Sequence, residues 1–100
     1  MGIAGFFRPG ADLMLARAAA RAGVPYIMSS ASCDSIEVAM AQAPETTWFQ
    51  IYGVRNPDIT VDLVRRAKAA NVRVLLLTID TPVMAKRDRN MRNGFRRSCP

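Results

Sequence analysis

Segments of two different hydrophobic periods alternate along the chain. Three segments rich in helix formers place apolar residues three and four positions apart, as expected of helices that bury one face. They cover residues 12–22, 34–42 and 58–70. Between them lie short apolar runs of β-prone residues that predict strands, namely Gly2–Phe6, Tyr26–Met28, Thr46–Tyr52 and Val72–Ile79. The alternation predicts a strand–helix unit that repeats along the sequence.

This order of elements predicts an α/β protein with a parallel sheet, because right-handed crossovers return each strand parallel to the one before. Regular spacing and short loops are also typical of a (β/α)8 TIM barrel, which needs about 250 residues to close. The chain has 100 residues. We therefore expect a partial TIM barrel with about its first four β-strands and three connecting helices. A small open sheet is the alternative.

Local spacing also predicts a helix start, an ion pair and a burial pattern. Asp34 followed by Glu37 resembles a capping box, with Asp34 as the N-cap of the second helix. Asp62 and Arg66 are four residues apart on the third helix, which predicts an ion pair on its polar side. Val72–Ile79 is almost entirely apolar, as expected of a parallel strand that is buried on both faces.

Composition indicates a globular protein, because half of the residues are hydrophobic. No apolar run approaches the roughly 20 residues that a membrane-spanning helix needs. The N-terminus lacks the basic and then apolar layout of a signal peptide. We expect a cytoplasmic protein with no membrane partner.

The formal net charge is +6, and six of the fourteen Lys and Arg residues fall between Lys86 and Arg97. Aromatic residues are few and do not alternate with the basic ones, which favours an anion-binding loop over a nucleic-acid surface. The chain has no histidine, and Cys33 and Cys99 lack the spacing of metal ligands. We therefore expect no nucleic-acid partner and no metal site, and the commonest general base is missing.

Polar residues stand at the ends of the predicted strands. Ser29 ends one strand, Gln50 and Tyr52 lie at the end of the next, and Thr78 and Asp80 end the last. Side chains two residues apart on a strand share a face, so each pair points to the same side of the sheet. The carboxyl ends of parallel strands carry binding and catalysis in α/β proteins. The pattern suits a planar heterocycle with several carbonyl and N–H groups.

Longer runs of the sequence resemble those of one enzyme family in both residues and intervals. The runs are Ser29-Ser30, Ser35-Ile36-Glu37, Trp48-Phe49-Gln50-Ile51-Tyr52, Leu77-Thr78-Ile79-Asp80-Thr81-Pro82, Lys86-Arg87 and Arg92-Asn93-Gly94-Phe95. With them the chain from Gly2 to about Phe95 resembles the FMN-dependent α-hydroxy-acid oxidases and dehydrogenases, which include glycolate oxidase, lactate oxidase and mandelate dehydrogenase. The resemblance implies that residues 1–100 are the N-terminal half-barrel of an FMN hydroxy-acid dehydrogenase domain.

The resemblance implies FMN as the cofactor and assigns residues to it. Ser29, Gln50 and Thr78 would hydrogen-bond the flavin ring, and the backbone of Gly2 would run beside it. In such a site the protein binds and orients the cofactor and tunes its reactivity.

The same resemblance implies a small 2-hydroxy acid as the substrate, of the lactate, glycolate or mandelate type, which is oxidised to a 2-oxo acid. Tyr52 would hydrogen-bond this substrate and Arg87 would hold its carboxylate through a two-pronged guanidinium contact. Asp80 would orient the family's catalytic histidine. Ala31 stands where several short-chain oxidases carry an aromatic residue, which predicts room for a larger substrate side chain.

Parts of the family pattern are missing from these residues. There is no His-Gly-x-Arg segment with the base and a second substrate arginine, and there are no phosphate-binding loops. We therefore expect the chain to be inactive alone and to self-associate through unpaired sheet edges, whereas the complete enzyme would be a homo-oligomer. Three alternatives stay open: a fragment of another FMN barrel, a small basic non-enzymatic binding module, and a truncated gene product without function. The hydroxy acid and the electron acceptor (oxygen, a quinone or a cytochrome) also stay open.

Overall fold

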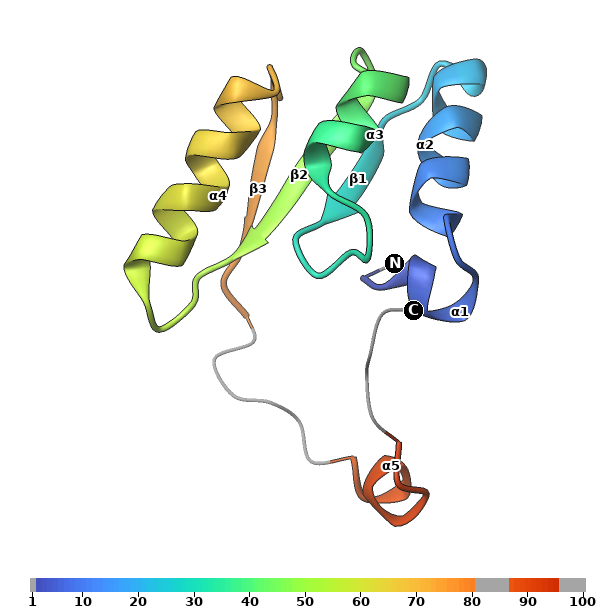
Figure 1. Ribbon diagram of the computed structural model, residues 1–100, viewed down its shortest axis with the longest axis vertical. Coiled ribbons are helices and arrows are strands. Elements are labelled where there is room, and N and C mark those ends of the chain that lie inside the picture. Colours follow the sequence, from blue (N-terminus) through green and yellow to red (C-terminus); the bar gives the residue numbers. More distant parts are fainter. Residues whose placement is uncertain (1, 81–86, 96–100) are drawn as a thin grey trace.

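The computed structural model describes residues 2–80 and 87–95 as a three-stranded parallel sheet with helices (Figure 1). In chain order the elements are α1 (Ala4–Phe7), α2 (Ala11–Ala22), β1 (Tyr26–Ser29), α3 (Ile36–Gln42), β2 (Thr47–Tyr52), α4 (Pro57–Ala69), β3 (Leu75–Thr78) and α5 (Asp88–Arg92). The α/β class and the parallel sheet predicted from the sequence are confirmed.

The strands pair in the order of the sequence, β1-β2-β3. Because crossovers between parallel strands are right-handed, α3 and α4 must lie on the same face of this sheet. Figure 1 shows α2, α3 and α4 side by side along that face. A sheet wound in one direction, with α2, α3 and α4 on one side, has the arrangement of a barrel wall and not that of a doubly wound sheet.

The hydrophobic core lies between the sheet and these helices. Along β2, buried residues alternate with half-buried ones, so one face of the strand contacts the helices and the other does not. The core contains three strand residues, Met28, Phe49 and Ile51, together with Ile36, Ala39 and Met40 from α3 and Ala67 from α4.

The prediction that the last strand is buried on both faces is wrong for the residues described. Leu75 and Leu77 of β3 share the helix-side face with Phe49 and Ile51, yet their exposed fractions are 43% and 60%. The cause is the position of β3 at the edge of the sheet, where α4 packs mainly over β2. The strand therefore presents an uncovered apolar stripe, which Ile79 extends.

The predicted first strand, Gly2–Phe6, is also wrong, so the described residues contain three strands and not four. This segment forms α1 instead, held by local backbone bonds such as Arg8 N to Ala4 O at 3.2 Å. A run of five apolar residues has no readable period and is compatible with a helical turn as well as a strand. Arg87, Arg89 and Arg92 belong to the basic stretch that the sequence predicted as an anion-binding loop, and here the structure forms the short helix α5.

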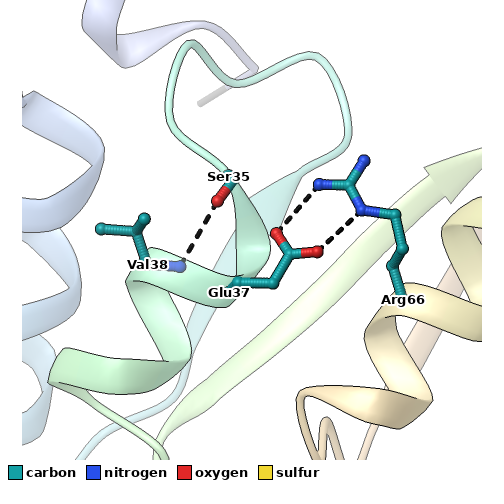
Figure 2. Close-up of polar contacts among 4 residues, drawn as sticks. All are labelled: Ser35, Glu37, Val38 and Arg66. Atoms are coloured by element: carbon teal, nitrogen blue, oxygen red, sulfur yellow. Dashed lines mark hydrogen bonds and ion pairs between the residues drawn. The ribbon is translucent and has the colours of Figure 1, made fainter.

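Figure 2 shows the start of α3 and its connection to α4. The N-cap is Ser35, whose Oγ accepts from the backbone N–H of Val38 at 3.4 Å, so the prediction of Asp34 as N-cap is wrong by one residue. Arg66 of α4 donates twice to the Glu37 carboxylate, at 2.7 and 2.9 Å. The predicted pairing of Arg66 with Asp62 is wrong because Glu37 accepts its guanidinium side-on.

Candidate functional site

Three polar side chains form a continuous hydrogen-bonded row across the carboxyl ends of the strands. Ser29 Oγ donates to Gln50 Oε1 at 3.0 Å, and Gln50 Nε2 donates to Thr78 Oγ1 at 2.7 Å. These residues come from β1, β2 and β3 in turn. The structure therefore brings together all three side chains that the sequence assigned to the flavin ring.

The register of the sheet explains this row. Ser29 is the direct partner of Gln50 in the β1–β2 ladder, and Tyr52, two residues after Gln50, is the partner of Thr78. Gln50 and Tyr52 share a face because they are two residues apart, and it is the face turned away from the helix-covered core. The row thus lies where the interior of a barrel would be.

The row keeps hydrogen-bonding capacity for a ligand. Gln50 Nε2 carries a second N–H, and Thr78 accepts through Oγ1 while retaining its own hydroxyl proton. Ser29 is only 6% exposed, and its Oγ also accepts from the backbone N–H of Ala31 at 3.1 Å, which fixes its orientation. A preorganised set of this kind suits the edge of a flat polar ring, because little conformational freedom is lost on binding.

Tyr52 and Asp80, the predicted catalytic residues, lie near the row but are not tied to it. Tyr52 is half-buried beside Thr78, and Asp80 is exposed two residues beyond Thr78. Within the described part of the chain, neither side chain forms a hydrogen bond or an ion pair.

Gly2 and Arg87, by contrast, meet in a pocket between α1 and α5. Its volume is about 450 Å³, and its lining residues are Gly2, Ile3, Phe6, Phe7, Arg87, Asn90 and Phe95. Phe6 makes edge-to-face contacts with both Phe7 and Phe95, with ring centroids 5.5 and 5.3 Å apart. The pocket combines a guanidinium with an aromatic wall. Lys86, the neighbour of Arg87 in the matching run, lies outside the described residues.

A buried carboxylate near this pocket was missed by sequence reasoning. Asp12 is fully buried; its Oδ2 accepts from the backbone N–H of Gly5 at 3.1 Å, and its Oδ1 accepts from the Tyr26 hydroxyl at 2.7 Å. The pKa of Tyr26 is raised well above its usual range. Burial is the largest cause, and the hydrogen bond to Asp12 is the second. In the sequence Asp12 reads as an ordinary acid in the first turn of a helix, so local pattern gave no signal of its partners.

Neither a candidate metal site nor a membrane-spanning helix is found in the described residues. Across residues 2–80 and 87–95, no group of His, Cys, Asp and Glu side chains is arranged to hold a metal ion. No helix in these ranges has the length and apolar character required to span a membrane.

Comparison with known proteins gives consistent matches over nearly the whole chain. The profile of a family described as FMN-dependent dehydrogenase matches residues 1–99. The chain is 44% identical to 4-hydroxymandelate oxidase of Amycolatopsis orientalis over 89% of its own length and 25% of that protein. It is 38% identical to glycolate oxidase 3 of Oryza sativa subsp. indica over 87% of its length and 24% of that protein.

Solved structures give the same result. A soluble mutant of the membrane-associated (S)-mandelate dehydrogenase from Pseudomonas putida matches with a TM-score of 0.88 at 38% identity, over 96% of this chain and 27% of that one. A mandelate oxidase structure matches with a TM-score of 0.82 at 42% identity, over 92% and 26%. The sheet and its helices therefore correspond to part of a TIM barrel. The chain spans about a quarter of the length of these relatives.

Proposed function

Because the chain belongs to the FMN-dependent dehydrogenase family, we propose that it forms the flavin-edge and substrate-carboxylate part of an enzyme that oxidises L-2-hydroxy acids to 2-oxo acids. In this reaction the substrate alcohol loses two electrons and two protons and becomes a ketone. FMN, when bound, supplies the acceptor for the two electrons. The residues of this chain bind and orient the two reactants.

The observation that carries the proposal is the row Ser29, Gln50 and Thr78. Its free N–H and hydroxyl groups, together with carbonyl and hydroxyl acceptors, match the alternating carbonyl and ring-nitrogen groups along the edge of a flavin. The row is held by its own hydrogen bonds and backed by the core of the sheet, so it fits a rigid planar ring. Gly2, which has open space around its Cα, would let the backbone approach that ring closely.

The substrate would bind beside the flavin through two side chains, and a third would orient the base. Arg87 would hold the carboxylate, because a guanidinium donates two parallel hydrogen bonds to its oxygens. Tyr52, next to Thr78 in the sheet, would donate to the substrate hydroxyl or carboxylate. Asp80 would orient a histidine base and stabilise it once protonated. Because the chain contains no histidine, that base would come from polypeptide outside these residues.

An aromatic substrate side chain is favoured over a methyl group or hydrogen. Phe6 and Phe95 form an aromatic wall in the same pocket as Arg87. Ala31 adds little bulk at the end of β1, where it follows the polar row. An acid with its carboxylate on Arg87 and an aryl group against this wall would bury more apolar surface than lactate or glycolate.

The uncovered stripe of β3 supports association with further strands. Leu75, Leu77 and Ile79 are exposed at an unpaired sheet edge, which is a template for pairing. We expect self-association of the isolated chain, and a homo-oligomeric complete enzyme. A cytoplasmic location and the lack of a nucleic-acid or membrane partner stay predictions from the sequence.

A flavin titration tests the proposal. The full chain is mixed with FMN, alone and together with a C-terminal half from a family member, and flavin fluorescence and absorbance are followed. We expect quenching in the mixture, and bleaching of the absorbance by mandelate more readily than by lactate or glycolate. Gln50→Leu should weaken FMN binding roughly tenfold through the loss of two hydrogen-bonding positions.

Gln42→Leu is the matched control, because Gln42 is an exposed glutamine that bonds only Arg17 among the described residues. It should leave FMN affinity unchanged. A folded wild-type mixture that does not bind FMN would overturn the proposal. If the chain instead bound nucleic acid with a steep salt dependence, the basic binding module would be the better account.

A further inference from the structure

Helix α1 has no cap of its own and obtains one from α2. Its N-cap position is Ile3, whose side chain has no hydrogen-bond acceptor. The Oδ2 atom of Asp12 fills that role, because it accepts from the N–H of Gly5 in the first turn of α1. The other carboxylate oxygen is held by the Tyr26 hydroxyl on β1. One buried side chain therefore connects α1, α2 and the sheet.

Helix α1 also packs closely against the loop between β1 and α3. A Cβ atom placed on Gly5 would lie 2.8 Å from Cβ of Cys33, which no real pair of such atoms tolerates. Ala4 and Gly5 are buried, whereas Phe7 is 76% exposed. Two contacts thus fix the turn at Gly5, the hydrogen bond to Asp12 and the close approach of Cys33.

Helix α1 in turn forms one wall of the pocket that contains Arg87. Gly2, Ile3, Phe6 and Phe7 all lie in or beside this four-residue helix, and Phe6 contacts Phe95 across the pocket. A shift of α1 would move the backbone of Gly2 and the aromatic wall together. The position of the wall depends on what holds the helix.

We propose that Asp12 is the positioning residue of this site: its buried carboxylate holds α1 at the carboxyl ends of the strands and so sets the place of Gly2 and Phe6. The inference rests on the proposed function for the identity of the ligand. The two hydrogen bonds of Asp12, to Gly5 and Tyr26, are observed independently of that function. Burial supports a dedicated role, because a carboxylate removed from water is costly unless its oxygens are hydrogen-bonded. Both oxygens of Asp12 have a partner, and neither partner is a cation.

If Asp12 positions α1, its removal should speed amide hydrogen exchange at other residues than if Asp12 only stabilises the fold. If Asp12 only stabilises the fold, its loss speeds hydrogen exchange everywhere in proportion. If it positions α1, the amide of Arg8, which bonds Ala4 O and not Asp12, loosens together with that of Gly5, while the centre of β2 stays protected. The comparison needs no flavin, so its outcome does not depend on the proposed function.

The experiment measures amide exchange by NMR in the full chain for Asp12→Ala, Asp12→Asn and Ser35→Ala. Asp12→Ala should speed exchange at both Gly5 and Arg8 roughly tenfold to a hundredfold, with Phe49 changed less than about twofold. Asp12→Asn should retain part of the protection, because its amide oxygen still accepts from Gly5. Ser35→Ala removes the cap of α3, which bonds Val38 and not α1, and should leave the ratio of Gly5 to Phe49 exchange as in the wild type.

Two results would overturn the proposal. One is equal acceleration at Arg8 and Phe49 in the Asp12 variants, and the other is faster exchange at Gly5 with unchanged exchange at Arg8. If Asp12→Ala does not fold, Asp12→Asn decides: Gly5 and Arg8 must exchange several times faster than in the wild type while Phe49 does not. Where the wild-type mixture binds FMN, the Asp12 variants must also lose more affinity than Ser35→Ala, and an equal loss contradicts a role in the site.

Discussion

The ion pair between Glu37 and Arg66 offers a quantitative test of how the helices are held together on the outside of the sheet. Arg66 Nε lies 2.7 Å from Glu37 Oε1 and Arg66 Nη2 lies 2.9 Å from Glu37 Oε2, so the contact is bidentate (Figure 2). Both side chains are 44% exposed. The perturbation is a double-mutant cycle with Glu37→Gln, which keeps the shape, and Arg66→Met, which keeps most of the apolar stem.

Solvent exposure and bidentate geometry together set the expected magnitude. Exposed ion pairs contribute about 0.2–1 kcal/mol, because water screens the charges and two long side chains lose freedom. The bidentate contact favours the upper part of that range, and we expect a coupling energy of about 0.5–1 kcal/mol. In a chain of this size that corresponds to a Tm difference of roughly 2–8 °C. Raising the salt to 1 M should reduce the coupling by more than half.

The coupling should also depend on pH in a defined direction. The pKa of Glu37 is lowered from 4.5 to about 2. The hydrogen bond from Arg66 is the largest cause, and a backbone hydrogen bond in the first turn of α3 is the second. A carboxyl whose pKa is lower in the folded state stabilises the fold above its unfolded pKa. This contribution is therefore complete above pH 4.5 and is lost as the pH falls towards 2. In Arg66→Met the pKa of Glu37 should rise but stay below 4.5, since the backbone bond remains.

The assay is urea unfolding of the four proteins at pH 7 and below pH 3, with an NMR titration of the Glu37 carboxyl carbon. Asp62→Asn is the control, because Asp62 is four residues before Arg66 and is the alternative partner. It should change the free energy of unfolding by less than about 0.3 kcal/mol. A coupling that is absent at pH 7, or equal at both pH values, would refute the reasoning. So would a coupling that moves to Asp62.

Three further predictions concern the core, a close approach and a buried hydroxyl. Phe49→Ala removes a side chain that is 3% exposed and should cost about 3–5 kcal/mol in urea unfolding; a loss below 1 kcal/mol would contradict its place in the core. Gly5→Ala forces a methyl group against Cys33 and should cost about 1–3 kcal/mol, whereas Gly53→Ala, with open space around it, should cost under 1 kcal/mol, and equal losses would contradict the close approach. Because the pKa of Tyr26 is raised, the fold is stabilised below its unfolded value of 10 and destabilised as the pH rises above it; Tyr26→Phe should therefore lose less stability than the wild type between pH 8 and 11, and parallel curves would contradict this.

Local sequence pattern predicted those features that depend on neighbours within one segment or on strand register. The long helices and the strand at Thr47–Tyr52 follow from their periods. The prediction that Gln50 and Tyr52 share a face is confirmed by alternating burial along β2, because the period of a strand is fixed at two. Parallel pairing then brought Ser29 and Thr78 to Gln50 without any information beyond strand ends.

Features that depend on distant contacts could not be predicted in this way. Asp62 and Glu37 are both acids within reach of Arg66, and only the packing of α3 on α4 decides between them. In the first turn of α1 the acceptor for the Gly5 N–H is Asp12 of α2, a contact that the apolar run at the N-terminus does not reveal. The exposure of β3 likewise depends on which elements cover the sheet edge, and not on the residues of the strand.

The sequential order of the sheet has a consequence for folding kinetics. Tyr26 pairs with Thr47 and Phe49 pairs with Leu75, so each ladder closes a loop of roughly 20 to 26 residues. The entropy of loop closure grows only slowly with length, and chains dominated by such short-range pairings fold faster than those that must join distant strands. Each strand can therefore dock as soon as the helix before it has formed, and the sheet can grow stepwise from β1 towards β3.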